Sequence, residues 1–92
     1  MYLLYELGKA IEQLEEFYTH TDLSEFLNAD YYDLYKFHFS IGLTIRNYLL
    51  KEDSVLYSLL KSAGIIQRDD MSNLILQLFY ISLKSKDKSK LF

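Results

Sequence analysis

The sequence predicts an all-α fold, a compact bundle of four to five helices around a buried central helix at about residues 30–50. Three observations support this class. Apolar residues recur at spacings of three and four along most of the chain, which is the period of an α-helix. Half of the 92 residues are hydrophobic, so a domain of this small size has material for a core. There is no proline and there are only three glycines, which favours helices with short connections.

A first helix is expected from about Tyr2 to Tyr18. Its apolar stripe is Leu4, Leu7, Ile11, Leu14 and Tyr18. Its acidic residues lie mostly off that stripe, where they face water or a partner: Glu6, Glu12, Glu15 and Glu16. A short second helix is expected over Leu23–Leu27, with Asp22 as its N-cap and Glu25 as the reciprocal acid three residues later.

The stretch from Asp30 to Leu50 reads as one helix that is apolar on nearly every side. One stripe contains Leu34, Phe37 or His38, Ile41, Ile45 and Leu49, and a second contains Tyr35, Phe39 and Leu43. A helix that is apolar all round must be covered by other elements or by a membrane. Polar residues interrupt this stretch before it reaches the ~18 apolar residues that a membrane span needs. We therefore expect a central bundle helix capped by Asp30, with Ile41 and Ile45 among the most buried residues.

Two further helices complete the predicted bundle. One starts near Val55 after an N-cap at Asp53 or Ser54, and Gly64 is placed to end it in a left-handed conformation. The last is expected from Met71 to about Leu83 after a cap at Asp69 or Asp70; its inward residues should be Leu74, Ile75, Leu78 and Ile81. Residues 1–84 should form one helical domain, and the basic tail 85–92 should fray.

The sequence lacks the residue patterns of common catalytic and metal sites. Without cysteine there can be no disulfide, thiolate metal site or thiol nucleophile. The two histidines, His20 and His38, are too far apart in the chain to suggest zinc ligands. The paired acids are adjacent, so on a helix they point in different directions and do not form a general acid/base pair. We therefore expect a non-enzymatic protein with no catalytic residue, no metal and no cofactor.

Charge is unevenly distributed along the chain. Residues 1–33 contain eight acidic residues and one basic residue, a charge of −7, whereas residues 34–92 contain nine basic and five acidic residues, a charge of +4. An acidic first third argues against nucleic acid and for a basic protein as the partner. The N-terminus has neither the basic region nor the cleavage site of a signal peptide, so we expect a cytoplasmic protein that does not enter a membrane.

The acidic third supplies the expected partner-binding residues. These are Glu12, Glu15, Glu16, Asp22 and Glu25, with Tyr18 as an aromatic anchor. The alternative is that an acidic partner contacts the basic half through Lys51, Lys61 and the Lys84–Lys90 tail. The sequence leaves open the oligomeric state, and whether Tyr31 and Tyr32 face the core or a partner.

One polar group near the end of the central helix is expected to be structural. A half-buried Arg46 needs a carboxylate partner, and Asp69 and Asp70 at the start of the last helix are the natural candidates. The sequence therefore predicts a polar clasp between the two helices, made by His38, Arg46, Asn47, Asp69 and Asp70.

The residues of this clasp recur in a longer pattern. It reads F-H-x-x-x-G-x-x-I-R-N, then after a variable helix G-I-x-x-x-D-D-x-S, and its positions here are Phe37, His38, Gly42, Ile45, Arg46, Asn47, Gly64, Ile65, Asp69, Asp70 and Ser72. The pattern resembles that of a small bacterial helical domain family of unknown function and covers about residues 34–83. The family often has a Trp-containing segment after R-N, where this chain has Tyr48–Leu50, and the acidic first third is this chain's own. The resemblance implies a helical fold and no known activity.

Small acidic proteins of this kind are similar to immunity proteins that neutralise bacterial toxins. This similarity is an analogy alone and does not rest on the residues of a site. The leading expectation is therefore a protein that binds a cognate toxin, basic and nuclease-like, from a contact-dependent or other secreted system. The alternative is a stand-alone cytosolic helical adaptor or regulatory module. A small hydrolase or a nucleic-acid binder is a weaker third class.

Overall fold

The computed structural model describes residues 2–89, with side chains for residues 2–86, and all its regular elements are helical. In chain order they are α1 (Tyr2–Phe17), α2 (Ser24–Asn28), the 3₁₀-helix η1 (Tyr31–Phe37), α3 (Ile41–Tyr48), α4 (Val55–Ser62) and α5 (Arg68–Ser89). The predicted all-α class is confirmed. Among the described residues, no helix is long and apolar enough to cross a bilayer.

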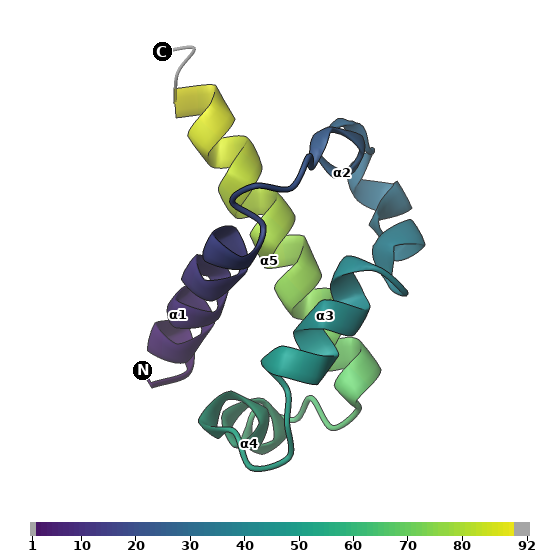
Figure 1. Ribbon diagram of the computed structural model, residues 1–92. Coiled ribbons are helices and arrows are strands. Elements are labelled where there is room, and N and C mark those ends of the chain that lie inside the picture. Colours follow the sequence, from purple (N-terminus) through teal and green to yellow (C-terminus); the bar gives the residue numbers. More distant parts are fainter. Residues whose placement is uncertain (1, 90–92) are drawn as a thin grey trace.

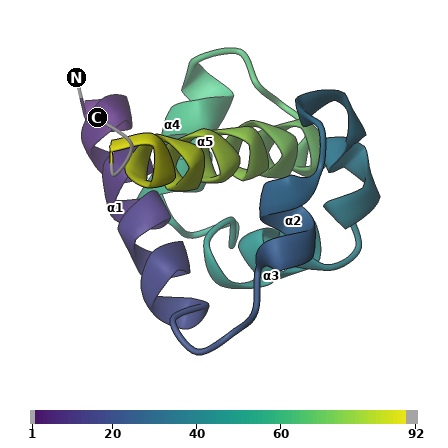
Figure 2. The same cartoon turned by 90° about the horizontal axis from the view of Figure 1, so that it is seen from above.

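Helix α5 is the centre of the fold. It runs through the middle of the molecule, with α1 on one side and α2 and η1 on the other (Figures 1 and 2). It packs against α1, α2, η1 and α3, whereas α4 packs against α1. One face of α5 is almost fully buried, with exposures of 8% or less, and consists of Met71, Ser72, Ile75, Leu76, Phe79 and Tyr80.

The expected central helix over residues 30–50 is wrong. The stretch is divided into η1, a turn and the short helix α3, and Ser40 interrupts the helical backbone with φ −111° and ψ −90°. The supposed second apolar stripe faces solvent, since Tyr35, Phe39 and Leu43 are 69%, 82% and 44% exposed. The apolar character all round this segment therefore reflects exposed rings, not burial on every side.

The 3₁₀ geometry of η1 explains how its residues are distributed. With three residues per turn, side chains at positions i and i+3 lie above one another. Leu34 and Phe37 therefore share the side that faces the core, Tyr32 and Tyr35 share an exposed side, and Asp33 and Lys36 form an ion pair at 3.9 Å. Asp30 precedes η1 in an extended conformation and makes no side-chain capping bond, so its predicted capping role is not realised.

The prediction for residues 30–50 is wrong in its first half. The core residues that it placed in what is now α3 are buried. Ile41 and Ile45 are 5% and 0% exposed, as predicted. The core is continued by Phe26 of α2, whose ring lies 5.8 Å from Phe79 and 5.5 Å from Tyr80 on α5. This aromatic contact holds the short helix α2 against the central helix.

Both ends of α4 follow the sequence prediction. The Ser54 hydroxyl accepts a hydrogen bond from the Tyr57 amide at 3.1 Å, which makes Ser54 the N-cap. Gly64 has a φ of 98°, and the amide of Ile65 donates to the carbonyl of Leu60 at 3.0 Å. This is the C-terminal motif in which a left-handed glycine satisfies the last carbonyl groups.

Helix α5 is longer than predicted at both ends. It begins at Arg68, so Asp69 and Asp70 lie in its first turn rather than before it. It also continues through residues 85–89, where a frayed tail was expected; residues 90–92 of that tail lie outside the described residues. The Lys84 ammonium donates to the carbonyl of Leu27 at 3.0 Å, and Lys86 pairs with Glu15. These two lysines thus connect α5 to α2 and α1.

The central position of α5 can be tested with two isoleucines of that helix. Ile75 is fully buried, whereas Ile81, which the sequence placed inward, is 47% exposed. Ile75→Ala should lower the free energy of unfolding by about 2–5 kcal/mol, because it removes buried methyl groups and leaves a cavity. Ile81→Ala is the control and should cost less than about 1 kcal/mol. Urea denaturation measures both, and equal losses would contradict this assignment of the core.

Candidate functional site

The Arg46 guanidinium is the centre of a polar cluster between α3 and α5. Its Nη1 donates to the Ser72 hydroxyl at 3.1 Å and lies 3.4 Å from Nδ1 of His38. Its Nη2 donates to the His38 carbonyl at 3.1 Å. The side chain is 12% exposed and Ser72 is fully buried, so these bonds form where water is largely excluded. The cluster joins the turn before α3, α3 itself and the first turns of α5.

Gly42 provides the space for this arrangement. A Cβ atom at this position would lie 3.3 Å from Nη1 of Arg46 and 3.4 Å from the Phe37 carbonyl oxygen. Both contacts are tight, so a side chain here would displace the guanidinium or the end of η1. A glycine one helical turn before Arg46 therefore lets the arginine fold back onto its own helix.

The carboxylates play a smaller part in the clasp than the sequence predicted. Arg46 Nε lies 4.0 Å from Oδ1 of Asp69, whose side chain is 70% exposed, so this ion pair is long and solvated. Asn47 and Asp70 make no side-chain hydrogen bond or ion pair with the described residues. The predicted clasp thus contains His38, Arg46 and, weakly, Asp69.

Sequence reasoning overlooked Ser72 as the main partner of Arg46. The serine accepts from Arg46 and donates to the Asp69 carbonyl at 3.0 Å. We assumed that a half-buried arginine requires a carboxylate, but a hydroxyl and a carbonyl oxygen satisfy it here. The signal was present, because Ser72 is the last position of the D-D-x-S pattern.

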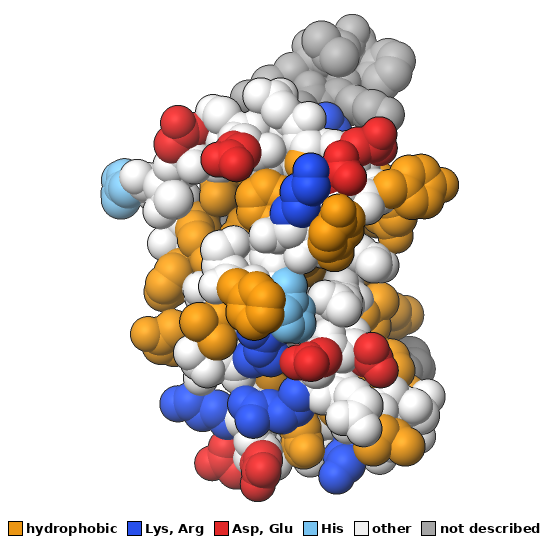
Figure 3. Space-filling view, turned by 90° about the vertical axis from the view of Figure 1, so that its right-hand side faces the viewer, with side chains coloured by type: hydrophobic (Ala, Val, Ile, Leu, Met, Phe, Trp, Pro, Cys, Tyr) orange, Lys and Arg blue, Asp and Glu red, His pale blue; other side chains and the backbone are white. Residues whose placement is uncertain are grey.

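The predicted acidic surface divides into two groups. Glu12 and Glu16 are exposed one turn apart on α1, while Asp22 and Glu25 are exposed in the following loop and on α2. None of the four forms an ion pair with a described residue. On the face that Figure 3 shows, acidic side chains lie at both the upper and the lower end, and hydrophobic ones reach the surface across the middle. These four carboxylates are available to a partner.

Two residues of the expected partner-binding set are used within the protein instead. Glu15 pairs with Lys86 and accepts a hydrogen bond from Ser82 at 3.3 Å, so it connects α1 to α5. Tyr18 is half-buried, and its hydroxyl lies 3.0 Å from Oγ1 of Thr44 on α3. Both therefore contribute to packing, and neither presents a free side chain like those of Glu12 and Glu16.

Asp22 has a local partner in Ser24. The serine hydroxyl and its amide both donate to Oδ1 of Asp22, and these two hydrogen bonds lower the pKa of the carboxyl group below its ordinary value. The bonds keep Asp22 ionised and close the turn into α2. The predicted N-cap role of Asp22 is wrong, because α2 begins at Ser24 with Leu23 at the N-cap position; Asp22 instead closes the turn before it through Ser24.

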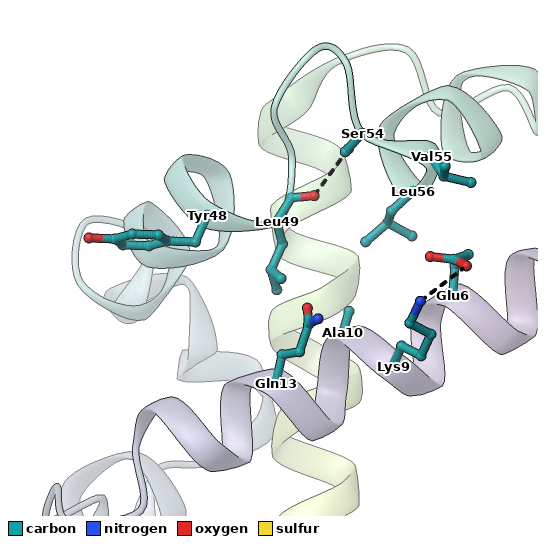
Figure 4. Close-up of a pocket in the computed structure, with 9 residues that line it drawn as sticks. All are labelled: Glu6, Lys9, Ala10, Gln13, Tyr48, Leu49, Ser54, Val55 and Leu56. Atoms are coloured by element: carbon teal, nitrogen blue, oxygen red, sulfur yellow. Dashed lines mark hydrogen bonds and ion pairs between the residues drawn. The ribbon is translucent and has the colours of Figure 1, made fainter.

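A small pocket of about 200 Å³ lies between α1 and the start of α4 (Figure 4). Three of its polar side chains are engaged with other groups: Glu6 pairs with Lys9 at 3.8 Å, and the Ser54 hydroxyl donates to the Leu49 carbonyl at 3.2 Å. These bonds stabilise α1 and the α3–α4 connection. The lining does not assemble a nucleophile with a base.

Comparison with known proteins adds one match. The family model described as a domain of unknown function, DUF6794, matches residues 5–83. No curated protein matches the chain, and no solved structure matches it. The family match confirms the expectation of a domain family without assigned function, and it covers more of the chain than the resemblance at residues 34–83.

The contribution of Arg46 can be measured against that of Arg68, which makes a single hydrogen bond to the Arg46 carbonyl from an exposed position. Arg46→Gln leaves the buried Ser72 hydroxyl and the His38 carbonyl without their donor. It should lower the free energy of unfolding by about 1–3 kcal/mol. Arg68→Gln should change it by about 0.5 kcal/mol or less. Chemical denaturation gives both values, and a neutral Arg46→Gln would show that the clasp does not stabilise the fold.

A second measurement concerns Asp22. Ser24→Ala removes the hydroxyl donor, so the pKa of Asp22 should rise toward its ordinary value of 3.8. Because the native pKa is lowered, the contact stabilises the fold above the ordinary pKa, and this stabilisation is lost as pH falls through the native value. NMR titration of the carboxyl carbon measures the shift. Ser62→Ala, an exposed change at the end of α4, should leave the Asp22 pKa unaltered.

Proposed function

We propose that this chain, which belongs to the domain family of unknown function DUF6794, is a non-enzymatic cytoplasmic binding protein. Most specifically, it is an immunity protein that neutralises a cognate bacterial toxin, delivered by a contact-dependent or other secreted system, through direct protein–protein contact. The toxin domain is basic and nuclease-like. The proposal concerns binding alone and assigns no catalytic residue.

One observation carries this proposal: four exposed carboxylates without an ion-pair partner among the described residues, at Glu12, Glu16, Asp22 and Glu25. They belong to a segment with a charge of −7. Unpaired surface charge of one sign attracts a partner of the opposite sign and accelerates the encounter. A nuclease cleft is basic because it binds phosphates, so it complements such a surface.

The two acidic groups lie on different elements, and this affects how a toxin could bind. Helix α1 and helix α2 are on opposite sides of α5 (Figure 1). A protein interface of standard size buries about 800 Å² on each partner. We therefore expect one of the two groups to dominate the contact, and separate reversal of each group will identify it.

The test uses the product of the neighbouring reading frame, which for an immunity protein encodes the toxin. Two double variants reverse the acidic groups, Glu12→Lys with Glu16→Lys and Asp22→Lys with Glu25→Lys. One of them should slow association with the purified toxin domain by tenfold or more, on the order of what loss of electrostatic steering produces. The effect should shrink as salt rises, because ions screen the attraction. Stopped-flow kinetics and protection of growth during toxin expression are the two readouts.

The matched control is Glu52→Lys with Asp53→Lys, which changes the net charge equally at two exposed acids of the α3–α4 loop. It should affect association by much less than the dominant acidic group does. If all three double variants behave alike, net charge and not a defined surface governs the encounter. A neighbouring product that neither binds nor is neutralised would contradict the immunity role and favour the adaptor alternative.

A further inference from the structure

Three tyrosines of η1 and two amides of α5 line an uncharged pocket that the acidic surface does not include. Its volume is about 210 Å³. The walls are Tyr31, Tyr32 and Tyr35 on one side and Asn73 and Gln77 on the other, and Leu34 and Leu76 form the floor. The two floor residues are 3% and 1% exposed, so the pocket rests directly on the core.

The geometry of η1 determines the side of the helix on which each tyrosine lies. Because side chains three apart are aligned in a 3₁₀-helix, Tyr32 and Tyr35 stand on one side, where they are 84% and 69% exposed. Tyr31 is held by a hydrogen bond from its hydroxyl to Oε1 of Gln77 at 3.1 Å, and its ring meets that of Tyr32 edge to face at 5.7 Å. The position of Tyr31 is therefore set before any ligand binds, which lowers the entropic cost of binding at that wall.

The electrostatics of the pocket favour a cation. The faces of the tyrosine rings are electron-rich, and the lining contains no lysine, arginine or histidine. An exposed acid stands beside each wall: Asp30 directly precedes Tyr31, and Asp70 lies one helical turn before Asn73. Neither acid forms an ion pair with a described residue. The nearest basic side chain of η1, Lys36, is paired with Asp33 at 3.9 Å.

The polar atoms indicate which cation fits best. A quaternary ammonium has no N–H group, so it would donate neither to the amide oxygen of Asn73 nor to the second lone pair of Gln77 Oε1, which already accepts from Tyr31. The planar guanidinium of arginine can stack on a tyrosine ring and at the same time donate to amide oxygens through its fork of N–H groups. A lysine ammonium cannot stack in this way. The combination of rings, amides and flanking acids therefore matches arginine.

We propose that this tyrosine pocket binds the guanidinium group of an arginine side chain from a basic protein partner. That the arginine belongs to a protein partner rests on the proposed function, whereas the affinity of the pocket for a guanidinium group does not. The second acidic group reaches the same short helix, since Glu25 of α2 lines a hollow together with Asp33 and Lys36 on another side of η1. A partner drawn to Glu25 would therefore meet the helix that carries the three tyrosines.

The test uses a small probe on the intact chain. N-acetyl-arginine amide is titrated into ¹⁵N-labelled protein, and the side-chain amide signals of Asn73 and Gln77 are followed by NMR. These signals should shift in a saturable way. The citrulline analogue, which has nearly the same shape without the charge, should bind at least about fivefold more weakly, on the order of one cation–π contact. The lysine analogue should also bind more weakly than arginine.

Two matched variants show whether the tyrosines are responsible. Tyr35→Leu should weaken binding of the arginine probe about fivefold. Tyr48→Leu changes a similarly exposed tyrosine of α3 (66%) and should leave this binding unaltered. Circular dichroism confirms that both variants fold. Absence of a saturable shift at Asn73 and Gln77, equal binding of citrulline or lysine, or equal effects of the two variants would each overturn the proposal.

The two proposals can fail separately. If the probe binds as described but the toxin contact is unaffected by charge reversal, the pocket stands and the acidic-surface mechanism fails. If the probe does not bind while reversal of Asp22 and Glu25 prevents toxin binding, the pocket proposal fails and the acidic surface stands.

Discussion

The fold depends on one constraint, the burial of a single face of α5. Phe79, Ile75 and Met71 lose all contact with solvent only because α1, α2, η1 and α3 all pack on the same helix. None of these four covering elements is longer than the 16 residues of α1, and α2 has only five. Helices this short are marginal in water on their own. Their stability therefore comes from docking on α5, and loss of that face would release each of them.

Polar contacts determine how the covering elements are positioned on α5. At its N-terminal end Arg46 bonds to Ser72 and fixes α3, and at its C-terminal end Lys84 and Lys86 bond to α2 and α1. Hydrophobic burial has no preferred direction, whereas these bonds do. They leave the outer side of α1 and the tyrosine side of η1 uncovered. The surfaces proposed for binding are thus the faces that docking on α5 does not use.

The sequence predicted the helical class, the bounds of α1 and α4, an N-cap of α4 at Asp53 or Ser54 and the glycine cap at Gly64, because each of these depends on local spacing or on one residue type. It placed the central helix incorrectly because residue type does not decide whether an aromatic ring is buried. Tyr35 and Phe39 read as core residues by type, but a 3₁₀ period turns Tyr35 outward and the turn after η1 exposes Phe39. In the candidate site the sequence identified Arg46, His38 and Asp69 but not Ser72, because residue type favours a carboxylate over a hydroxyl as the partner of an arginine.

Native-state hydrogen exchange of the backbone amides tests the central role of α5 most directly. Some amides lie in the part of the protein that opens last. These amides exchange with solvent only when the whole protein unfolds. If α5 is the element on which the others dock, the amides of Ile75 to Tyr80 will be the slowest, with free energies of opening equal to that of global unfolding, and those of η1 will open at lower cost. Slower exchange in η1 and α3 than in α5 would contradict this account and restore the segment at residues 30–50 as the centre of the fold.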